Sequence, residues 1–292
     1  MIISRIDGGL GNQLFQYALG RHLAEKYDTE LKFDLSFFNQ QGDRSYELHN
    51  FCMDFSVATQ EECLLLRFRK PTAFTKLTWA LLQQKSYPLV PANSFCRERK
   101  LNTYDSRVLH KGPNMYLDGL WQTEKYFTPI SDIIRQEVQL RFSGPTPYHA
   151  LADTIRRTSS VCIHVRRGDY LNHSVFAACT PVYYQRAIDY ISSVITSPIF
   201  FVFSNDIPWC MEHLPVPPSS VFVGSETPLP PHEDLMLMSL CRHNITANST
   251  FSWWGAWLNR NPDKVVCTPS QWHRNGRQIH DTLPEQWIKI DL

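Results

Sequence analysis

The sequence predicts an α/β protein whose two lobes face each other across a cleft. Strand-like and helix-like segments alternate in the second half of the chain, which is the pattern of parallel βαβ units. The chain also opens with a strand, a loop, a helix and a strand. The segment SGPTP at 143–147 lies between these parts and carries turn-forming and helix-breaking residues. We therefore expect an N-terminal lobe over 1–145 and a C-terminal lobe over 146–292.

Apolar spacing defines the elements of the first lobe. Phe15, Leu19 and Leu23, for example, recur at the spacing of one helix face. The expected elements are a strand at 1–6, a loop at 7–12, a helix at 13–27, a strand at 30–34, a helix at 60–84, a strand at 115–121 and a helix at 129–142.

The second lobe has a more regular pattern. Short runs rich in Val, Ile and Phe are each followed by a stretch with helical spacing, and turn residues separate them. The expected strands lie at 161–165, 199–204, 220–224, 244–247 and 264–268, and the expected helices lie at 181–195, 207–214, 232–241 and 251–259.

Composition excludes several classes of protein. Hydrophobic residues make up 43% of the 292 residues, which argues against disorder, and the net charge of +1 argues against a nucleic-acid partner. The eight cysteines form no C-x-x-C pair, so we expect free thiols and no zinc site. The N-terminus has no long apolar region, and no stretch is apolar enough to span a membrane. We expect a cytoplasmic protein, with peripheral association with the inner membrane left open.

Three polar clusters follow three expected strands of the second lobe. In open α/β sheets, ligands bind beyond the carboxyl ends of the strands. Each cluster alone fits ordinary turns and helix caps, whereas three at one sheet edge favour a ligand site. The clusters are HVRRGD with His164, Arg166, Arg167 and Asp169, then SND with Ser204, Asn205 and Asp206, then NST with Asn248, Ser249 and Thr250.

The residue types in these clusters suit a nucleoside diphosphate. Arginine side chains match phosphate oxygens, and the expected helix after Ser249 offers free backbone N–H groups to an anion. Asn205 or Asp206 can bond to the edge of a base. No D-x-D pair occurs, so nothing in the sequence suggests two carboxylates holding a metal on the diphosphate. We expect arginine and backbone dipoles to neutralise its charge, with no metal and no cofactor.

The loop GGLGNQ in the first lobe raises one alternative. Gly8, Gly9 and Gly11 allow close approach of the backbone to a ligand. They also half-match the dinucleotide-binding fingerprint, since the loop follows a strand and Asp34 ends the next one. The third glycine of that fingerprint would fall at Leu14, so an NAD enzyme is only weakly indicated.

Five segments together resemble the α-1,2-fucosyltransferases of bacterial glycosyltransferase family 11. In chain order they are GGLGNQLFQYALGRHLA, YLDGLWQTEKYF, HVRRGDY, VFSND and ANSTFSWWGAWLN. The resemblance implies a GT-B fold of two facing Rossmann-like lobes, with an acceptor-side N-terminal lobe and a C-terminal lobe that holds GDP-fucose. It implies transfer of L-fucose to the 2-hydroxyl of a terminal galactose on an oligosaccharide, with inversion and without a metal.

The resemblance also implies roles for individual residues. Arg166 is expected nearest the β-phosphate, and His164, Asp169 and Asn12 complete the catalytic set. Asp206 matches an acidic position that reads guanine in related enzymes. The expected donor-binding residues are Gly9, Gly11, Arg167, Asn205, Asp206, Asn248, Ser249, Thr250, Phe251 and Ser252.

The acceptor side is less well defined by sequence. Asp169 could act as general base or could brace Arg166 or His164, and the enzyme could work without a carboxylate base. Asp34, Asp118 and Glu124 are further carboxylates in the first lobe, of which Asp34 is retained as an acceptor-side candidate. Trp121 and Tyr126 are the aromatic candidates for acceptor binding, because at least two of Trp253, Trp254 and Trp257 belong in a core at their helical spacing. Two alternatives stay open: transfer in another linkage such as α-1,6, and a nucleotide-sugar-binding protein without catalysis.

Overall fold

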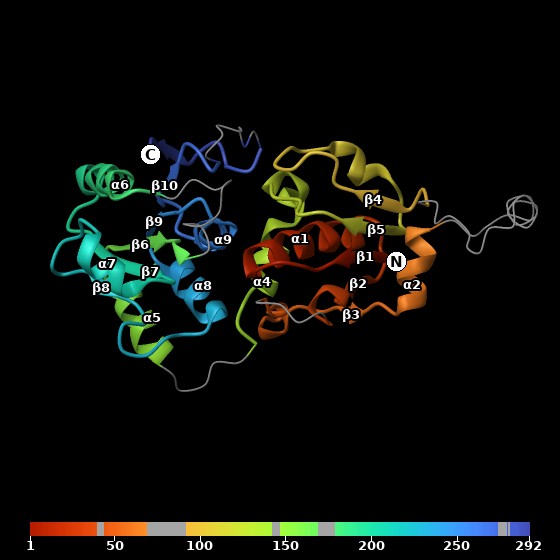
Figure 1. Cartoon of the computed structure of the whole chain (residues 1–292), viewed down its shortest axis with the longest axis horizontal. Helices are drawn as coiled ribbons and strands as arrows, with labels where there is room; N and C mark the ends of the chain where they lie inside the picture. The colour runs from red at the N-terminus through yellow and green to blue at the C-terminus, as the bar shows by residue number, and fades with distance from the viewer. Residues whose placement is uncertain (40–43, 69–91, 142–146, 169–178, 274–278, 280) are drawn as a thin grey trace, which may run out of the picture.

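The protein contains two parallel β-sheets, one in each half of the chain. The structure is a computed structural model that describes residues 1–39, 44–68, 92–141, 147–168, 179–273, 279 and 281–292. Figure 1 shows the sheets and their helices as two lobes that lie side by side. The strands of one sheet fall between residues 2 and 118, and those of the other between 160 and 290. The order of the lobes is as expected, while the boundary at 145 stays a prediction.

The first sheet has β1 at its centre and the strand order β3-β2-β1-β5-β4, with every pairing parallel. The strand-loop-helix-strand opening is confirmed. The elements of this lobe are β1 (Ile2–Arg5), α1 (Leu10–Lys26), β2 (Leu31–Asp34), β3 (Ser56–Val57), α2 (Gln60–Arg67), β4 (Phe95–Arg97), β5 (Met115–Asp118) and α4 (Ser131–Glu137), with 3₁₀ turns at Ser36–Asn39, Leu48–Asn50, Ser106–His110, Glu124–Tyr126 and Thr128–Ile130.

The second sheet has the order β11-β10-β9-β6-β7-β8 and is also parallel throughout. All nine elements expected here are present. The elements of this lobe are α5 (Pro147–Arg157), β6 (Ser160–Val165), α6 (Pro181–Val194), β7 (Ile199–Ser204), α7 (Ile207–His213), β8 (Val221–Phe222), α8 (Pro231–Leu240), β9 (His243–Ile245), α9 (Thr250–Leu258), β10 (Val266–Pro269) and β11 (Ile288–Ile290).

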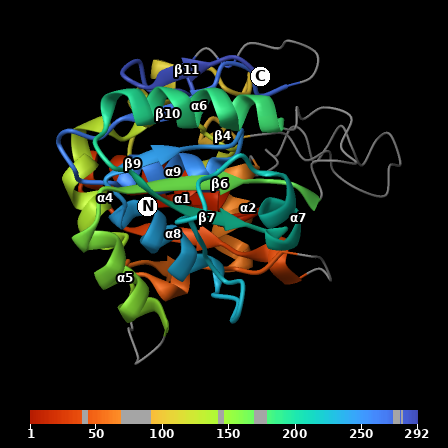
Figure 2. The same ribbon diagram turned by 90° about the vertical axis from the view of Figure 1, so that its left-hand side faces the viewer.

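Helices cover both faces of the second sheet, so its strands are buried on both sides. Figure 2 shows α6 on one side of the sheet and α5 and α8 on the other. Side chains alternate along β6, and Val161 and Ile163 pack into the core under α6, whereas Cys162 belongs to the core shared with α8 and α9. His164 is therefore on the α9 side of the sheet, with its ring centroid 5.5 Å from that of Phe251.

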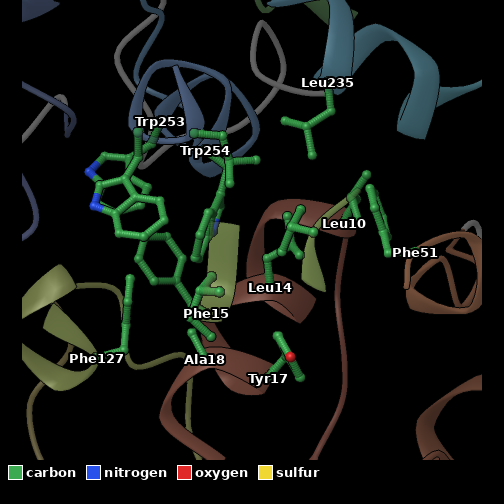
Figure 3. Packing of buried hydrophobic residues seen from close by; sticks show 14 of the residues in the cluster. Leu10, Leu14, Phe15, Tyr17, Ala18, Phe51, Phe127, Leu235, Trp253 and Trp254 are labelled. Carbon is green, nitrogen blue, oxygen red and sulfur yellow. The ribbon is translucent and has the colours of Figure 1, made fainter. Parts of the chain in front are cut away.

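One hydrophobic core continues from the first lobe into the second. Figure 3 shows Phe15 of α1 pointing toward Trp253 and Trp254 of α9. The ring centroid of Phe15 lies 4.5 Å from that of Trp253 and 5.0 Å from that of Trp254, and Phe127 stacks on Trp254 at 5.4 Å. Such aromatic pairs contribute about 0.5–1.5 kcal/mol each beyond the area they bury. These contacts explain why α9 is apolar all round. They confirm the expectation that at least two of its three tryptophans are core residues, since all three are buried.

The glycine loop differs from expectation, because α1 begins at Leu10 rather than after Asn12. Gly9 is the N-cap and Gly11 lies in the first turn. A Cβ atom on Gly11 would stand 2.5 Å from the backbone carbon of Thr250 and 2.6 Å from the backbone nitrogen of Phe251. Gly11 therefore lets the first turns of α1 and α9 touch directly.

Other differences have local causes. The helix expected at 129–142 ends at Glu137, because the next residues leave it to pair with the chain near Phe51. β3, β4 and β11 are two or three residues long, which is too short for a periodic pattern. α5 was missed although Tyr148, Ala152 and Ile155 have helical spacing and are buried. Residues 69–84 of an expected helix and 143–146 of the expected linker lie outside the described residues.

The Gly11 contact predicts a sharp difference between two neighbouring glycines. Gly11→Ala forces apart two backbones that cannot repack, so we expect it to lower the free energy of unfolding by about 1–3 kcal/mol or more. Gly9→Ala is the matched control, because the nearest atom to its Cβ would be Nη1 of Arg44, at 3.9 Å. Urea unfolding of both variants measures the difference, and equal midpoints would contradict the direct contact between α1 and α9.

Candidate active site

A cavity of about 770 Å³ lies between the two lobes at the ends of their strands. Its walls come from the segments that follow β1, β2, β4 and β5 of the first sheet and β6 to β10 of the second, together with the start of α8. Parallel strands place their carboxyl ends at one edge of each sheet, and here the two edges meet. The lining residues are Gly8, Gly9, Leu10, Gly11, Asn12, Arg44, Ser45, Glu47, Leu101, Asn102, Leu120, Gln122, His164, Arg166, Phe203, Ser204, Asn205, Leu229, Pro231, Asp234, Asn248, Ser249, Thr250, Phe251, Trp272 and His273.

The three polar clusters of the second lobe do converge, since β9, β6 and β7 are neighbours in the sheet. Arg166 follows β6 and lines the cavity beside Asn205, which follows β7. Asn205 accepts a hydrogen bond from the backbone N–H of Arg167 at 3.0 Å, which ties the two segments together. Asp169 lies outside the described residues.

His164 is buried and lies beneath Arg166. Burial, together with the nearby Arg166 guanidinium, lowers the pKa of its imidazole to about 3. The ring is therefore neutral near pH 7, and it cannot donate a proton as an imidazolium there. Its Nδ1 atom has no hydrogen-bond partner among the described residues. This environment suits a neutral hydrogen-bonding side chain rather than an acid–base group.

Arg167 and Asp206 form a support beside the cavity rather than part of its wall. The Arg167 guanidinium lies 3.6 Å from the ring centroid of Trp209, and its Nε donates to Asp206 at 3.1 Å. The other carboxylate oxygen of Asp206 caps α7 by accepting from the N–H of Trp209. Both expected roles in donor binding stay predictions, and neither side chain lines the cavity.

The N-terminus of α9 closes another side of the cavity. Ser249 is its N-cap, and Ser249, Thr250 and Phe251 line the wall. Asn248 is fixed from behind, because its Nδ2 donates to the carbonyl of Trp272 at 3.0 Å. Ser252 is 1% exposed and bonds the backbone of Ala247, so it supports this turn from below instead of lining the cavity.

The first lobe contributes a second helix N-terminus. α1 starts at Leu10, so the loop of Gly8 and Gly9 and the first turn with Asn12 face the cavity. Two helices thus begin at one cavity and direct the positive ends of their dipoles toward it, where Arg166 adds a full charge. This arrangement is suited to an anion with several oxygens.

Three expected acceptor-side residues are placed elsewhere, and these assignments are corrected. Trp121 and Tyr126 are each 1% exposed and pack on each other at a centroid distance of 5.6 Å, so in this conformation they cannot stack on a sugar. Asp34 is 6% exposed and accepts hydrogen bonds from the Tyr116 hydroxyl and the Ser36 N–H. Asp118 and Glu124 are also absent from the cavity wall.

Asp234 and Glu47 are cavity carboxylates that sequence reasoning missed. Burial, with a contribution from neighbouring Glu233, raises the pKa of Asp234 to about 7. A carboxylate oxygen of Glu47 lies 3.7 Å from Nδ1 of His232 of the other lobe, and this neighbour lowers the pKa of Glu47. Acidic residues are ordinary at the start of a helix, so no sequence signal distinguished Asp234.

A second cavity, of about 720 Å³, lies at the other end of α9. Its cations have structural roles: Arg135 lies 4.3 Å from the ring centroid of Trp257, and Lys264 donates to the carbonyls of Ala256 and Asn259. Lys264 thus caps the C-terminal end of the helix. We place the active site at the opposite end, where strands end and helices begin.

Three general properties complete the description. Within the described ranges, no helix is long and apolar enough to cross a membrane. The same part of the chain brings no three His, Cys, Asp or Glu side chains into an arrangement that could hold a metal ion. Its cysteines are free thiols, and those other than Cys52 are buried.

Comparison with known proteins identifies the family. An alpha-1,2-colitosyltransferase of Escherichia coli is 31% identical over 314 residues, which cover 100% of this chain and 99% of the relative. A galactoside alpha-(1,2)-fucosyltransferase 1 of Rattus norvegicus is 34% identical over 142 residues, which cover 47% of this chain and 37% of the relative. The crystal structure of POFUT1 in complex with GDP-fucose has a TM-score of 0.50 at 14% identity, covering 91% of this chain and 97% of that one, and this likeness confirms the GT-B-like fold. The family model for glycosyl transferase family 11 matches residues 1–291, and the protein therefore belongs to glycosyltransferase family 11.

Proposed function

We propose that the protein transfers L-fucose from GDP-fucose to the 2-hydroxyl of a terminal galactose on an oligosaccharide, with inversion. The observation that carries this proposal is the convergence of Arg166 with the N-termini of α1 and α9 in one cavity. That arrangement suits a diphosphate. The sugar and the linkage are supported by family membership and by the printed names of the two relatives.

The diphosphate is the leaving group of this reaction, and its negative charge grows as the bond to the sugar breaks. Fixed donors aimed at that charge lower the barrier, because they need no reorganisation during the reaction. Arg166 and the N–H groups at Ser249–Phe251 are such donors in the second lobe, and the first turn of α1 with Asn12 supplies others from the first lobe.

We assign the nucleobase to the part of the cavity around Asp234. Leu229, Pro231 and Phe203 supply apolar wall to the same cavity, and Asp234 supplies a carboxylate. A guanine base has flat apolar faces and an edge with N–H donors, which matches this combination. Asp206 remains the competing candidate, although its two carboxylate oxygens already accept hydrogen bonds from Arg167 and Trp209.

One observation favours a second donor sugar. The match to the colitosyltransferase covers the whole of this chain, whereas the match to the fucosyltransferase covers less than half of it. Colitose is L-fucose without its 3-hydroxyl, so the two donors would share every interaction except those with that group. Transfer in another linkage and binding without catalysis are further alternatives.

Product analysis tests the proposal. The protein is incubated with lactose and with GDP-fucose or GDP-colitose, and NMR of the product gives the sugar, the linked hydroxyl and the anomeric configuration. An α-1,2-fucosyl product supports the proposal. Transfer of colitose without transfer of fucose would change the assigned donor to GDP-colitose. A product with another linkage would change the assigned acceptor hydroxyl. Binding of the GDP-sugar without any product would support the non-catalytic alternative.

The first prediction from this proposed function concerns Arg166. Arg166→Lys keeps the positive charge but loses the planar fork that bonds two phosphate oxygens. We expect kcat to fall by about 100–1000-fold, the scale for one lost transition-state donor, with thermal unfolding unchanged. The measurement is the initial rate at saturating GDP-fucose. A folded Arg166→Lys protein with nearly normal kcat would remove Arg166 from the mechanism.

The second prediction concerns Asp234. A base with N–H donors is bound by the ionised carboxylate, so GDP affinity should fall as the pH drops through about 7, the pKa of Asp234. Asp234→Asn should weaken GDP binding at pH 8 by about 1.5–3 kcal/mol and remove this pH dependence. Calorimetry measures both effects.

Two controls accompany the Asp234 experiment. The folded pKa lies above the ordinary value of 3.8, so this carboxyl lowers stability as the pH rises from about 4 to about 7, and the full cost is present above pH 7. Asp234→Asn should therefore unfold at the same or a higher temperature, which excludes misfolding as the cause of weak binding. Asp206→Ala is the comparison variant, and a larger loss of GDP affinity there would move base recognition to Asp206.

The third prediction is that the reaction needs no metal. Arg166 and the two helix N-termini supply positive charge to the diphosphate from the protein itself. We expect an unchanged initial rate in excess EDTA and at most a modest response to added Mg²⁺ or Mn²⁺. A rate that collapses with EDTA and returns with Mn²⁺ would require a metal in the mechanism.

A further inference from the structure

Asn12 is held by two side chains that come from different parts of the chain. Its Oδ1 atom accepts a hydrogen bond from Nε2 of Gln122 at 3.0 Å and another from the Thr250 hydroxyl at 3.1 Å. All three residues line the cavity. Both bonds end on Oδ1, so the N–H donors on Nδ2 of Asn12 point away from Gln122 and Thr250.

We propose that Gln122 is a positioning residue, which holds the Asn12 amide so that its N–H groups face the diphosphate of the donor. The inference rests on the proposed function, since it needs an anion in the cavity. An asparagine amide turned by 180° exchanges its oxygen and its nitrogen. The N–H groups attract a diphosphate, whereas the carbonyl oxygen repels it, so the orientation of Asn12 decides the sign of its effect.

Gln122 selects this orientation as long as its own Nε2, rather than its Oε1, faces Asn12, as it does in this structure. The Thr250 hydroxyl both donates and accepts hydrogen bonds, so it fits either orientation of Asn12. The Nε2 group of Gln122 only donates, so it requires the oxygen of Asn12 to face it. The orientation of the Asn12 amide therefore depends on whether residue 122 presents a hydrogen-bond donor to it.

The turn that carries Gln122 is held in place by burial and by a hydrogen bond. Trp121 has a φ of 56°, a left-handed conformation that is unfavourable for a residue with a side chain. Its burial in the core holds this conformation, and Glu98 accepts a hydrogen bond from the N–H of Leu120 at 2.7 Å. Trp121 thus contributes to the site by anchoring the turn rather than by contacting a sugar.

The test uses Gln122→Glu, which keeps the size and shape of the side chain. The ionised carboxylate cannot donate to Oδ1 of Asn12, so Asn12 turns its N–H groups toward it and its carbonyl toward the donor. At pH 8 we expect kcat with GDP-fucose to fall by about 100-fold, and GDP affinity measured by calorimetry to fall by about tenfold.

The pH profile separates positioning from a structural role. A protonated carboxyl group can donate, so acidification to about pH 5 should return the variant toward the parent protein measured at the same pH. In an Asn12→Ala background, Gln122→Glu should have little further effect, because it acts through Asn12. Gln139→Glu is the matched control, since it makes the same charge change on an exposed residue of the first lobe.

The outcomes are distinct. Gln122→Glu with activity and GDP affinity within about twofold of the parent at pH 8 would overturn the inference, because Gln122 would then be accepting from Asn12. A defect that is the same at every pH, or that persists in the Asn12→Ala background, would also overturn it. A parent protein that binds GDP but transfers no fucose would contradict the proposed function without contradicting this inference. Calorimetry of GDP binding to the same variants would then still decide the role of Gln122.

Discussion

The direct contact between the first turns of α1 and α9 is the constraint on which the rest of the site depends. Gly11 lies against the backbone of Thr250 and Phe251, at a distance that excludes any side chain. The contact brings two helix N-termini, one from each lobe, to the same point. Since each helix follows the carboxyl end of a strand, it also aligns the functional edges of the two sheets. The cavity between the lobes is therefore a consequence of helix packing, and its positive potential follows from the same geometry.

The site divides into residues that face the ligand and residues that hold them. Arg166 faces the cavity, while Arg167 stacks on Trp209 and ties the same segment to α7. Asn248 and Ser252 fix the start of α9 from behind. Supporting side chains of this kind explain why the polar clusters are larger than a diphosphate needs, because part of each cluster bonds to the protein itself.

Sequence reasoning predicted the fold, and it predicted that three polar clusters of the second lobe meet at one sheet edge, for a clear physical reason. Strand periodicity and turn residues are local signals, so the segments after β6, β7 and β9 could be located before their contacts were known. The failures involve burial and long-range contacts. Trp121 and Tyr126 looked like cleft aromatics, yet the core beside η4, the turn at Glu124–Tyr126, buries both. Asp234 and Gln122 carry no local signal, because their roles depend on residues far away in the chain.

The shared core of the two lobes limits which sequence changes this protein can accept. Phe15 and Phe127 pack against Trp253 and Trp254, so neither lobe has a hydrophobic interior of its own on this side. A second half that lacked rings matching Phe15 and Phe127 would leave a gap or a clash at this interface. The loops around the cavity stand apart from these ring contacts, so they can change without disturbing the interior that the two lobes share.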